Sequence, residues 1–229
     1  MTNTNEPGIC DAASVIALRV RDGRPSVLVG QRGSRAAFMP DKFVFPGGAV
    51  DPDDAVLREH VVLEPRTASL LARLAPEDLA KDLALAAIRE LWEETGLRLA
   101  APSRERPGLV PRGWAGFVEG GRRPRTEALR LVFRAITPPG RPRRFDARFF
   151  LVDAAEIEGA PDDFGGASGE LRHLQWVELP EAGRLPLPFI TEVVLSEVAA
   201  LLDADRRQDR PVPFFNHSED SSHFHLLDA

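Results

Sequence analysis

The sequence predicts an α/β fold in which helices cover a mixed β-sheet. Two observations support this: short β-rich runs recur through the middle of the chain, and one long amphipathic helix comes early while a second comes late. With 229 residues and 43% hydrophobic residues, the chain is long enough to bury one substantial core. We therefore expect one domain over residues 9–205, followed by a C-terminal extension over residues 206–229.

The charge balance favours a small ligand over a polyanion. The formal net charge is −6 and the pI is near 5.5, whereas nucleic acids and anionic membranes require a broad basic surface. Of the 29 basic residues, 27 are arginine, which indicates a bias in the base composition of the source genome. For that reason we expect the Arg-rich residues 122–144 to form a solvated hairpin rather than a surface that attracts anions.

Cysteine content and hydropathy favour a cytoplasmic protein. Cys10 is the single cysteine, so no intrachain disulfide can form. The first eleven residues are polar and lack the basic start and apolar centre of a signal peptide, and no apolar run reaches about 18 residues. We expect neither a leader peptide nor a membrane span.

The first elements are predicted to be strands and a glycine loop. Residues 13–20 and 26–30 are rich in β-formers, and Asp22-Gly23 between them suits a hairpin turn. A third run at residues 43–45 leads into Pro46-Gly47-Gly48. Two adjacent glycines permit close approach of the backbone to a ligand, so this loop is a candidate edge of a binding site.

A long helix is predicted over residues 77–95. Pro76 suits its first turn, Glu77 and Asp78 favour its N-terminus, and Gly96 is placed to end it in a left-handed conformation. At 100° per residue the apolar positions share one face, and Glu90, Glu93 and Glu94 share the opposite face. The remaining elements are a short helix at residues 67–74, strands at residues 129–136, 145–152 and 171–179, and a closing helix at residues 188–202.

The three glutamates have two interpretations. Like charges within one and a half turns repel one another by a few tenths of a kcal/mol per pair, and a hard divalent cation beside the glycine loop would offset that repulsion. Such a cation would also neutralise phosphate charge and activate water. The alternative is that the three side chains form the solvated face of an amphipathic helix.

The surrounding residues resemble the Nudix hydrolase family. Residues 89–97, RELWEETGL, match the motif half REUxEExGU at every position, where U is a bulky apolar residue, and Phe45-Pro46-Gly47-Gly48 resembles its entrance. The resemblance implies a Nudix-type α/β/α sandwich with a mixed sheet. It also implies Mg²⁺- or Mn²⁺-dependent hydrolysis of a diphosphate linkage in a nucleoside diphosphate derivative.

Two departures from the motif are informative. Its first glutamate is replaced by Asp54, and 34 residues separate Asp54 from Arg89 where the motif has seven. Residues 55–81 are therefore interpreted as an insertion between the glycine loop and the catalytic helix. A branch that includes peroxisomal coenzyme A diphosphatases also carries a long insertion there, which favours coenzyme A or acyl-coenzyme A as substrate. Capping of the site, formation of a homodimer and packing at the edge remain open as roles of the insertion.

The resemblance assigns roles to individual residues. Metal ligands would be Glu90, Glu93, Glu94 and the carbonyl of Gly48, with Gly47 and Gly48 beside the substrate. Glu90 would also orient or deprotonate water, with Glu93 in the catalytic set, and Arg89 would hold the carboxylates in place. Glu119 and Glu170 are alternatives for the general base.

Two other functions remain open. One is a Nudix-fold ligand-binding or regulatory module without catalysis. The other is the isopentenyl diphosphate isomerase branch, which needs a catalytic cysteine, and Cys10 is badly placed for that role. The expected partner is a small nucleotide-like molecule, with no nucleic acid and no membrane.

Overall fold

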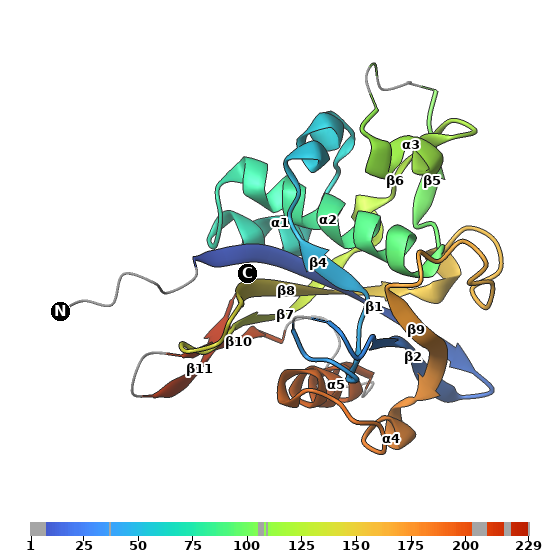
Figure 1. The fold of residues 1–229 in the computed structure, drawn as a ribbon. Coiled ribbons are helices and arrows are strands. Elements are labelled where there is room, and N and C mark those ends of the chain that lie inside the picture. The colour runs from blue at the N-terminus through green and yellow to red at the C-terminus, as the bar shows by residue number, and fades with distance from the viewer. Residues whose placement is uncertain are drawn as a thin grey trace.

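The computed structural model describes residues 8–36, 38–104, 108, 110–202, 210–217 and 221–228. A mixed sheet lies between two layers of helices, with α1 and α2 on one face and α4 and α5 on the other (Figure 1). The predicted α/β/α sandwich is therefore confirmed.

The main sheet contains nine of the described strands, in the order β11-β10-β7-β8-β1-β2-β3, with β4 also paired to β1 and β9 also paired to β2. The pairs β1·β8 and β7·β10 are parallel and the others are antiparallel. The bounds are β1 Ile9–Arg21, β2 Arg24–Arg32, β3 Phe43–Val44, β4 Gly47–Ala49, β7 Arg130–Ile136, β8 Arg144–Asp153, β9 Leu171–Glu178, β10 Val212–His217 and β11 Ser222–Leu227.

The central strands are buried on both faces. Val15 and Ala17 of β1 pack on the α2 side, whereas Ile16 and Leu18 pack on the α5 side. Alternate residues of a strand point to opposite faces, so a strand covered on both sides must be apolar throughout. The predicted turn between β1 and β2 is confirmed, since Asp22 and Gly23 both have positive φ, at 52° and 75°.

Helix α2 (Glu77–Thr95) has the predicted bounds and carries the acidic residues. Gly96 ends it with φ 76° and donates its N–H to the carbonyl of Trp92. Ala84, Leu85, Ile88 and Leu91 are fully buried, as the periodicity predicts, and hold this helix against the sheet.

The segment before α2 packs onto it. It forms a 3-10 helix, η1 (Pro52–His60), and α1 (Pro65–Ala72), the latter close to the predicted short helix. Leu57, Leu70 and Leu71 are buried and belong to the same core cluster as α2. This segment is therefore part of the main hydrophobic core.

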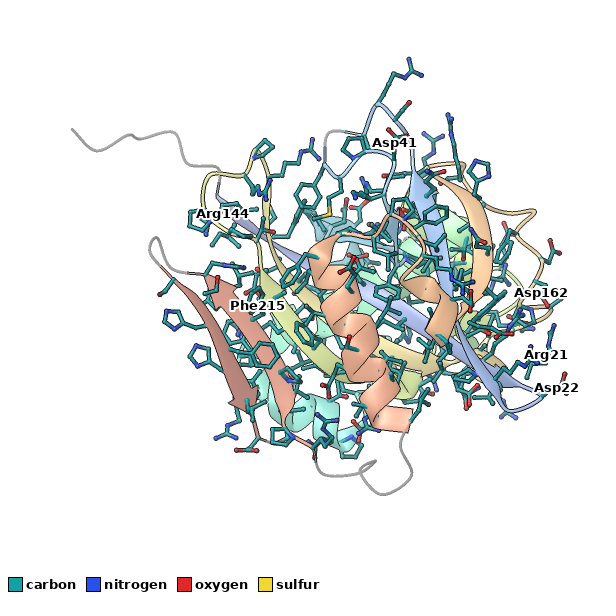
Figure 2. The ribbon with its side chains drawn as sticks, turned by 90° about the horizontal axis from the view of Figure 1, so that it is seen from below. Arg21, Asp22, Asp41, Arg144, Asp162 and Phe215 are labelled. Atoms are coloured by element: carbon teal, nitrogen blue, oxygen red, sulfur yellow. The ribbon has the colours of Figure 1, made fainter. Side chains whose placement is uncertain are left out.

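The opposite layer consists of α4 (Leu179–Ala182) and α5 (Phe189–Leu202). Figure 2 shows α5 lying across this face of the sheet. Val194 and Val198 of α5 are fully buried and pack with the alternate residues of β1 and β2. The predicted closing helix is thus confirmed, and it begins one residue later than predicted.

Several elements were not predicted from the sequence. They are short and lack a clear hydrophobic period: α3 (Arg112–Val118), β5 (Ala100–Pro102), β6 (Arg122–Pro124), η2 (Thr126–Ala128) and η3 (Ala154–Glu156). Within residues 122–144 most of the chain forms strand or turn, and many arginines pair with carboxylates. Examples are Arg122 with Glu158 and Arg123 with Glu127.

The C-terminal stretch adds a hairpin to the sheet. Strand β10 pairs with β7 in parallel, and β11 pairs with β10. Phe215 of β10 packs against Phe189 of α5, with ring centroids 6.0 Å apart, so this part of the predicted extension packs on the body (Figure 2). The predicted boundary at residues 205 and 206 lies outside the described residues. Across the described parts of the chain, no helix is both long enough and apolar enough to span a bilayer.

Candidate functional site

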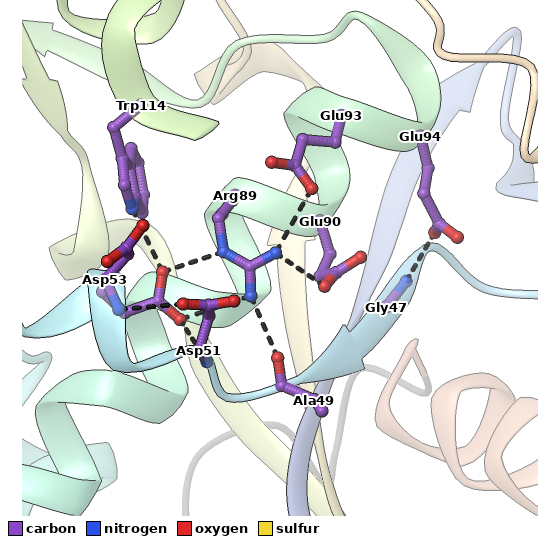
Figure 3. A network of polar contacts seen from close by, with 10 residues as sticks. Gly47, Ala49, Asp51, Asp53, Arg89, Glu90, Glu93, Glu94 and Trp114 are labelled. Carbon is purple, nitrogen blue, oxygen red and sulfur yellow. Dashed lines mark hydrogen bonds and ion pairs between the residues drawn. The ribbon is translucent and has the colours of Figure 1, made fainter. Parts of the chain in front are cut away.

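The acidic face of α2 meets strand β4 and the start of α3, and this meeting point brings the predicted residues together (Figure 3). Glu90, Glu93 and Glu94 project from α2, and Gly47 and Gly48 lie on β4. A solvated acidic face would leave these carboxylates in water, but Glu94 is only 2% exposed. The solvated-face interpretation is therefore wrong for Glu94.

Arg89 is the centre of the polar network in Figure 3. Its Nη1 donates to Glu90 Oε1 at 2.7 Å and to Glu93 Oε2 at 3.2 Å, and its Nη2 donates to the carbonyl of Ala49 at 2.9 Å. The guanidinium is buried, and its rigid fork of donors binds α2 to the end of β4. Arg89 thus contacts two of the three glutamates, and its positioning role stays a prediction.

Asp54 anchors Arg89 from the other side. Its Oδ1 accepts from Arg89 Nε at 2.8 Å and from Trp114 Nε1 at 3.1 Å, while its Oδ2 accepts from the backbone N–H of Asp51 at 3.0 Å. Arg89 Nη2 also donates to Oδ2, at 3.3 Å. Each oxygen of this fully buried carboxylate thus has two donors. The sequence did not predict that Trp114 of α3 belongs to this site, because no local pattern links it to Asp54, 60 positions earlier.

The two glycines of β4 each occupy a position without room for a side chain. A Cβ at Gly48 would lie 2.4 Å from Glu90 Oε1, and a Cβ at Gly47 would lie 2.5 Å from the carbonyl oxygen of Ala13. The backbone N–H of Gly47 donates to Glu94 Oε2 at 2.8 Å. Gly48 therefore borders a carboxylate of the candidate site, and Gly47 keeps β4 against β1.

The carboxylates have shifted acidities with identifiable causes. Burial, together with the charges of Glu90 and Glu170, raises the pKa of Glu94 to about 8, against the hydrogen bond from Gly47. Burial also raises the pKa of Glu90, although Arg89 opposes this shift. For Arg89, burial disfavours the charge, but Asp54 and Glu90 outweigh it and raise the pKa. Burial at this face of α2 therefore disfavours the charged forms of Glu90 and Glu94.

A cavity of about 540 Å³ opens beside the glutamates. Glu93 and Glu94 line it from α2, Arg112 and Gly113 line it from α3, and Glu170 lines it from the loop before β9. Glu170 therefore faces the acidic helix from a distant part of the sequence. Glu119, the other alternative for a base, is not among the residues that line this cavity.

The donor chemistry at this face suits Mg²⁺ or Mn²⁺. Carboxylate oxygens and a backbone carbonyl are hard ligands, and two of the glutamates are buried with raised pKa values. Among the described residues, however, no three His, Cys, Asp or Glu side chains converge as a preassembled metal site. The contacts explain this, because Glu90 and Glu93 turn toward Arg89 while Glu94 turns toward Gly47.

Comparisons with known proteins point to one family. A Caenorhabditis elegans protein named nudix hydrolase 7 is 27% identical over 195 residues, which cover 78% of this chain and 57% of the nematode protein. A Citrobacter koseri protein named as the uncharacterized Nudix hydrolase NudL is 35% identical over 74 residues, which cover 29% of this chain and 38% of that protein. The chain thus spans about half or less of the length of these relatives. No family model matches the chain.

Among solved structures, a NUDIX hydrolase from Alicyclobacillus acidocaldarius is similar over 86% of this chain and 94% of its own. It has a TM-score of 0.67 and 28% sequence identity. The fold is that of the Nudix hydrolases, and these relatives support the assignment of the chain to the Nudix hydrolase family.

Proposed function

We propose that this protein hydrolyses the diphosphate linkage of a nucleoside diphosphate derivative with bound Mg²⁺ or Mn²⁺. The observation that carries the proposal is the Arg89 network, which fixes Glu90 and Glu93 on the helix face beside the glycine strand. A purely structural salt-bridge network would not require three glutamates beside a glycine strand. It would also not require the Glu90 carboxylate to lie so close to Gly48 that no Cβ fits there.

The metal would be held by Glu90, Glu93, Glu94 and the carbonyl of Gly48. When bound, it would neutralise charge on the diphosphate and lower the pKa of a coordinated water. Arg89 would position two of the glutamates without touching the substrate, since its donors are already directed at Glu90, Glu93 and Asp54. Gly47 and Gly48 would let the diphosphate approach the backbone of β4.

We assign the general base to Glu170. Glu170 lines the 540 Å³ cavity together with Glu93 and Glu94, and its charge acts on both Glu90 and Glu94. In the proposed reaction Glu170 takes a proton from water as the water oxygen bonds to one phosphorus. The bridging P–O bond breaks, and its electron pair stays on the departing phosphate. Glu90, engaged by Arg89, would then serve as a metal ligand.

Coenzyme A and its acyl derivatives are the most specific substrates that we propose. This choice rests on the long segment between Asp54 and Arg89, which resembles the insertion of peroxisomal coenzyme A diphosphatases. The test is product analysis with Mg²⁺ or Mn²⁺ on coenzyme A, acyl-coenzyme A, ADP-ribose, NADH and nucleoside triphosphates. Release of adenosine 3′,5′-bisphosphate and a phosphopantetheine product would support the coenzyme A assignment.

Variants separate the roles. Glu93→Gln should abolish metal-dependent turnover while the fold is kept. Glu170→Gln should lower kcat about 100-fold with little change in KM, as expected for loss of a proton acceptor. Glu119→Gln is the matched control and should be close to wild type. Full activity of Glu93→Gln would refute the site assignment, and tight nucleotide binding without turnover would favour the ligand-binding module.

A further inference from the structure

A second cavity, of about 340 Å³, has a lining rich in arginine. Four of the residues that line it are arginines: Arg32, Arg35, Arg143 and Arg172. They come from the end of β2, the loop after it, the turn before β8, and β9. Convergence of four separate positions on one cavity is not explained by an arginine-rich composition, which would spread these side chains over the surface.

The surrounding structure holds these positions together. Strand β9 pairs with β2 so that Gln31 faces Arg172 and Arg32 faces Leu171. The pairing shifts register just before this point, and His173 takes a positive φ of 50°. Such a bulge redirects neighbouring side chains, here next to Arg172. Phe38 packs edge-on against Phe145 at 5.4 Å, which ties the loop after β2 to the start of β8, near Arg143.

The protein balances the positive charge in this cavity only in part, through Glu170. Arg32 lies 3.7 Å from Glu170, but within the described chain no side chain of opposite charge pairs with Arg35, Arg143 or Arg172. The Nε of Arg32 is buried and has no hydrogen-bond partner among the described residues. In a protein of net charge −6, three unpaired guanidiniums around one cavity favour a bound anion.

The two cavities share a wall. Glu170 lines both the 540 Å³ acidic cavity and the 340 Å³ arginine cavity. A substrate whose diphosphate lay at the acidic face would therefore have the arginine cavity next to it. We propose that the arginine cavity binds a phosphate monoester of the substrate that is separate from the diphosphate to be cut. This inference rests on the proposed function and narrows its substrate to nucleotides that carry such an additional phosphate.

Pairs of substrates that differ by one phosphate monoester test the inference directly. Suitable pairs are coenzyme A with 3′-dephospho-coenzyme A and NADPH with NADH, each assayed with Mg²⁺ on the full chain. The pocket variant carries Arg143→Gln and Arg172→Gln. The control variant carries Arg24→Gln and Arg141→Gln, which remove the same charge from exposed positions outside the cavity.

We expect the wild type to prefer the member with the extra phosphate by about tenfold or more in kcat/KM, in at least one pair. The pocket variant should reduce that preference to about twofold through KM, and the control variant should keep it. Equal losses on both members of each pair would overturn the inference, because the arginines would then contact the scissile diphosphate. An unchanged preference in the pocket variant, or no preference in the wild type, would overturn it as well.

A binding measurement keeps the two proposals distinguishable. Adenosine 3′,5′-bisphosphate and AMP are titrated against wild type and both variants without metal, so that turnover is not needed. Tighter binding of the bisphosphate to wild type and to the control variant, lost in the pocket variant, supports the arginine site even if no diphosphate is cut. Equal binding of the two nucleotides by wild type and pocket variant overturns it, even if hydrolysis is observed.

Discussion

Asp54 and Arg89 form a doubly hydrogen-bonded ion pair in the protein interior, with Nε to Oδ1 at 2.8 Å and Nη2 to Oδ2 at 3.3 Å. Asp54 is fully buried and the side chain of Arg89 is 8% exposed. The pair joins the start of η1 to the middle of α2. Through Arg89, the aspartate of a distant turn fixes the orientation of Glu90 and Glu93.

Asp54→Asn should therefore damage both stability and activity. The amide NH₂ of asparagine would face N–H donors that now point at a carboxylate, and Arg89 would lose its buried counter-charge. Breaking one side of a buried ion pair costs about 3–5 kcal/mol, so unfolding in urea should show a loss of that size. Asp53→Asn, on the exposed side of the same turn, is the control and should change stability by less than about 0.5 kcal/mol. Wild-type stability for Asp54→Asn would contradict the anchoring role.

Alanine substitution at the two adjacent glycines of β4 should have different effects on stability and activity. At Gly47 the added Cβ meets the backbone carbonyl of Ala13, which cannot move without separating β4 from β1, so Gly47→Ala should lose about 1–3 kcal/mol of stability. At Gly48 it meets the end of the Glu90 side chain, which can rotate away. Gly48→Ala should thus fold nearly normally but lose most metal-dependent turnover.

Thermal unfolding and kinetics of both variants, with Gly183→Ala as a control that has open space around it, check this pair. Normal activity of Gly48→Ala would mean that Glu90 does not act next to this backbone. An equal loss of stability in Gly47→Ala and Gly48→Ala would contradict the expectation that the first meets backbone and the second a movable side chain.

The sequence was sufficient to predict α2 and its acidic face. Pro76, the 3.6-residue period and Gly96 are all local signals, and the helix has the predicted bounds. The hairpin turn at Asp22 and Gly23 was predictable for the same reason. Strand β4 was not, because two glycines indicate a loop, and it becomes a strand only by pairing with β1.

The candidate site was only partly predictable, since many of its contacts join residues that are far apart in the sequence. The motif identified Arg89 and the glutamates, but the sequence showed Asp54 only as a departure from the family pattern. Its partner Trp114 lies on a seven-residue helix without periodicity. Cavities formed by several loops, such as the one lined by Arg35, Arg143 and Arg172, depend on how the strands align and have no local signal.

The segment between Asp54 and α2 should contribute strongly to stability. Leu71 of α1 is fully buried in the cluster that includes α2, so Leu71→Ala would leave a cavity and cost about 2–5 kcal/mol. Val62→Ala, at a position that is 57% exposed in the same segment, should cost less than about 0.5 kcal/mol. Equal urea midpoints for the two variants would show that this segment folds independently of the core.

Divalent metal should stabilise the folded protein through the glutamates of α2. Ligand that binds only the native state adds about 2.7 kcal/mol at 100 times its dissociation constant, so Mg²⁺ or Mn²⁺ should raise Tm in a concentration-dependent way. Glu94→Gln keeps an oxygen that can accept from Gly47 N–H but removes a charged ligand, so its Tm should respond much less to metal. Glu59→Gln, on the exposed surface of η1, should respond like wild type. If metal raised the Tm of Glu94→Gln as much as that of the wild type, the cation would bind away from the face of α2 where Glu90 and Glu94 lie.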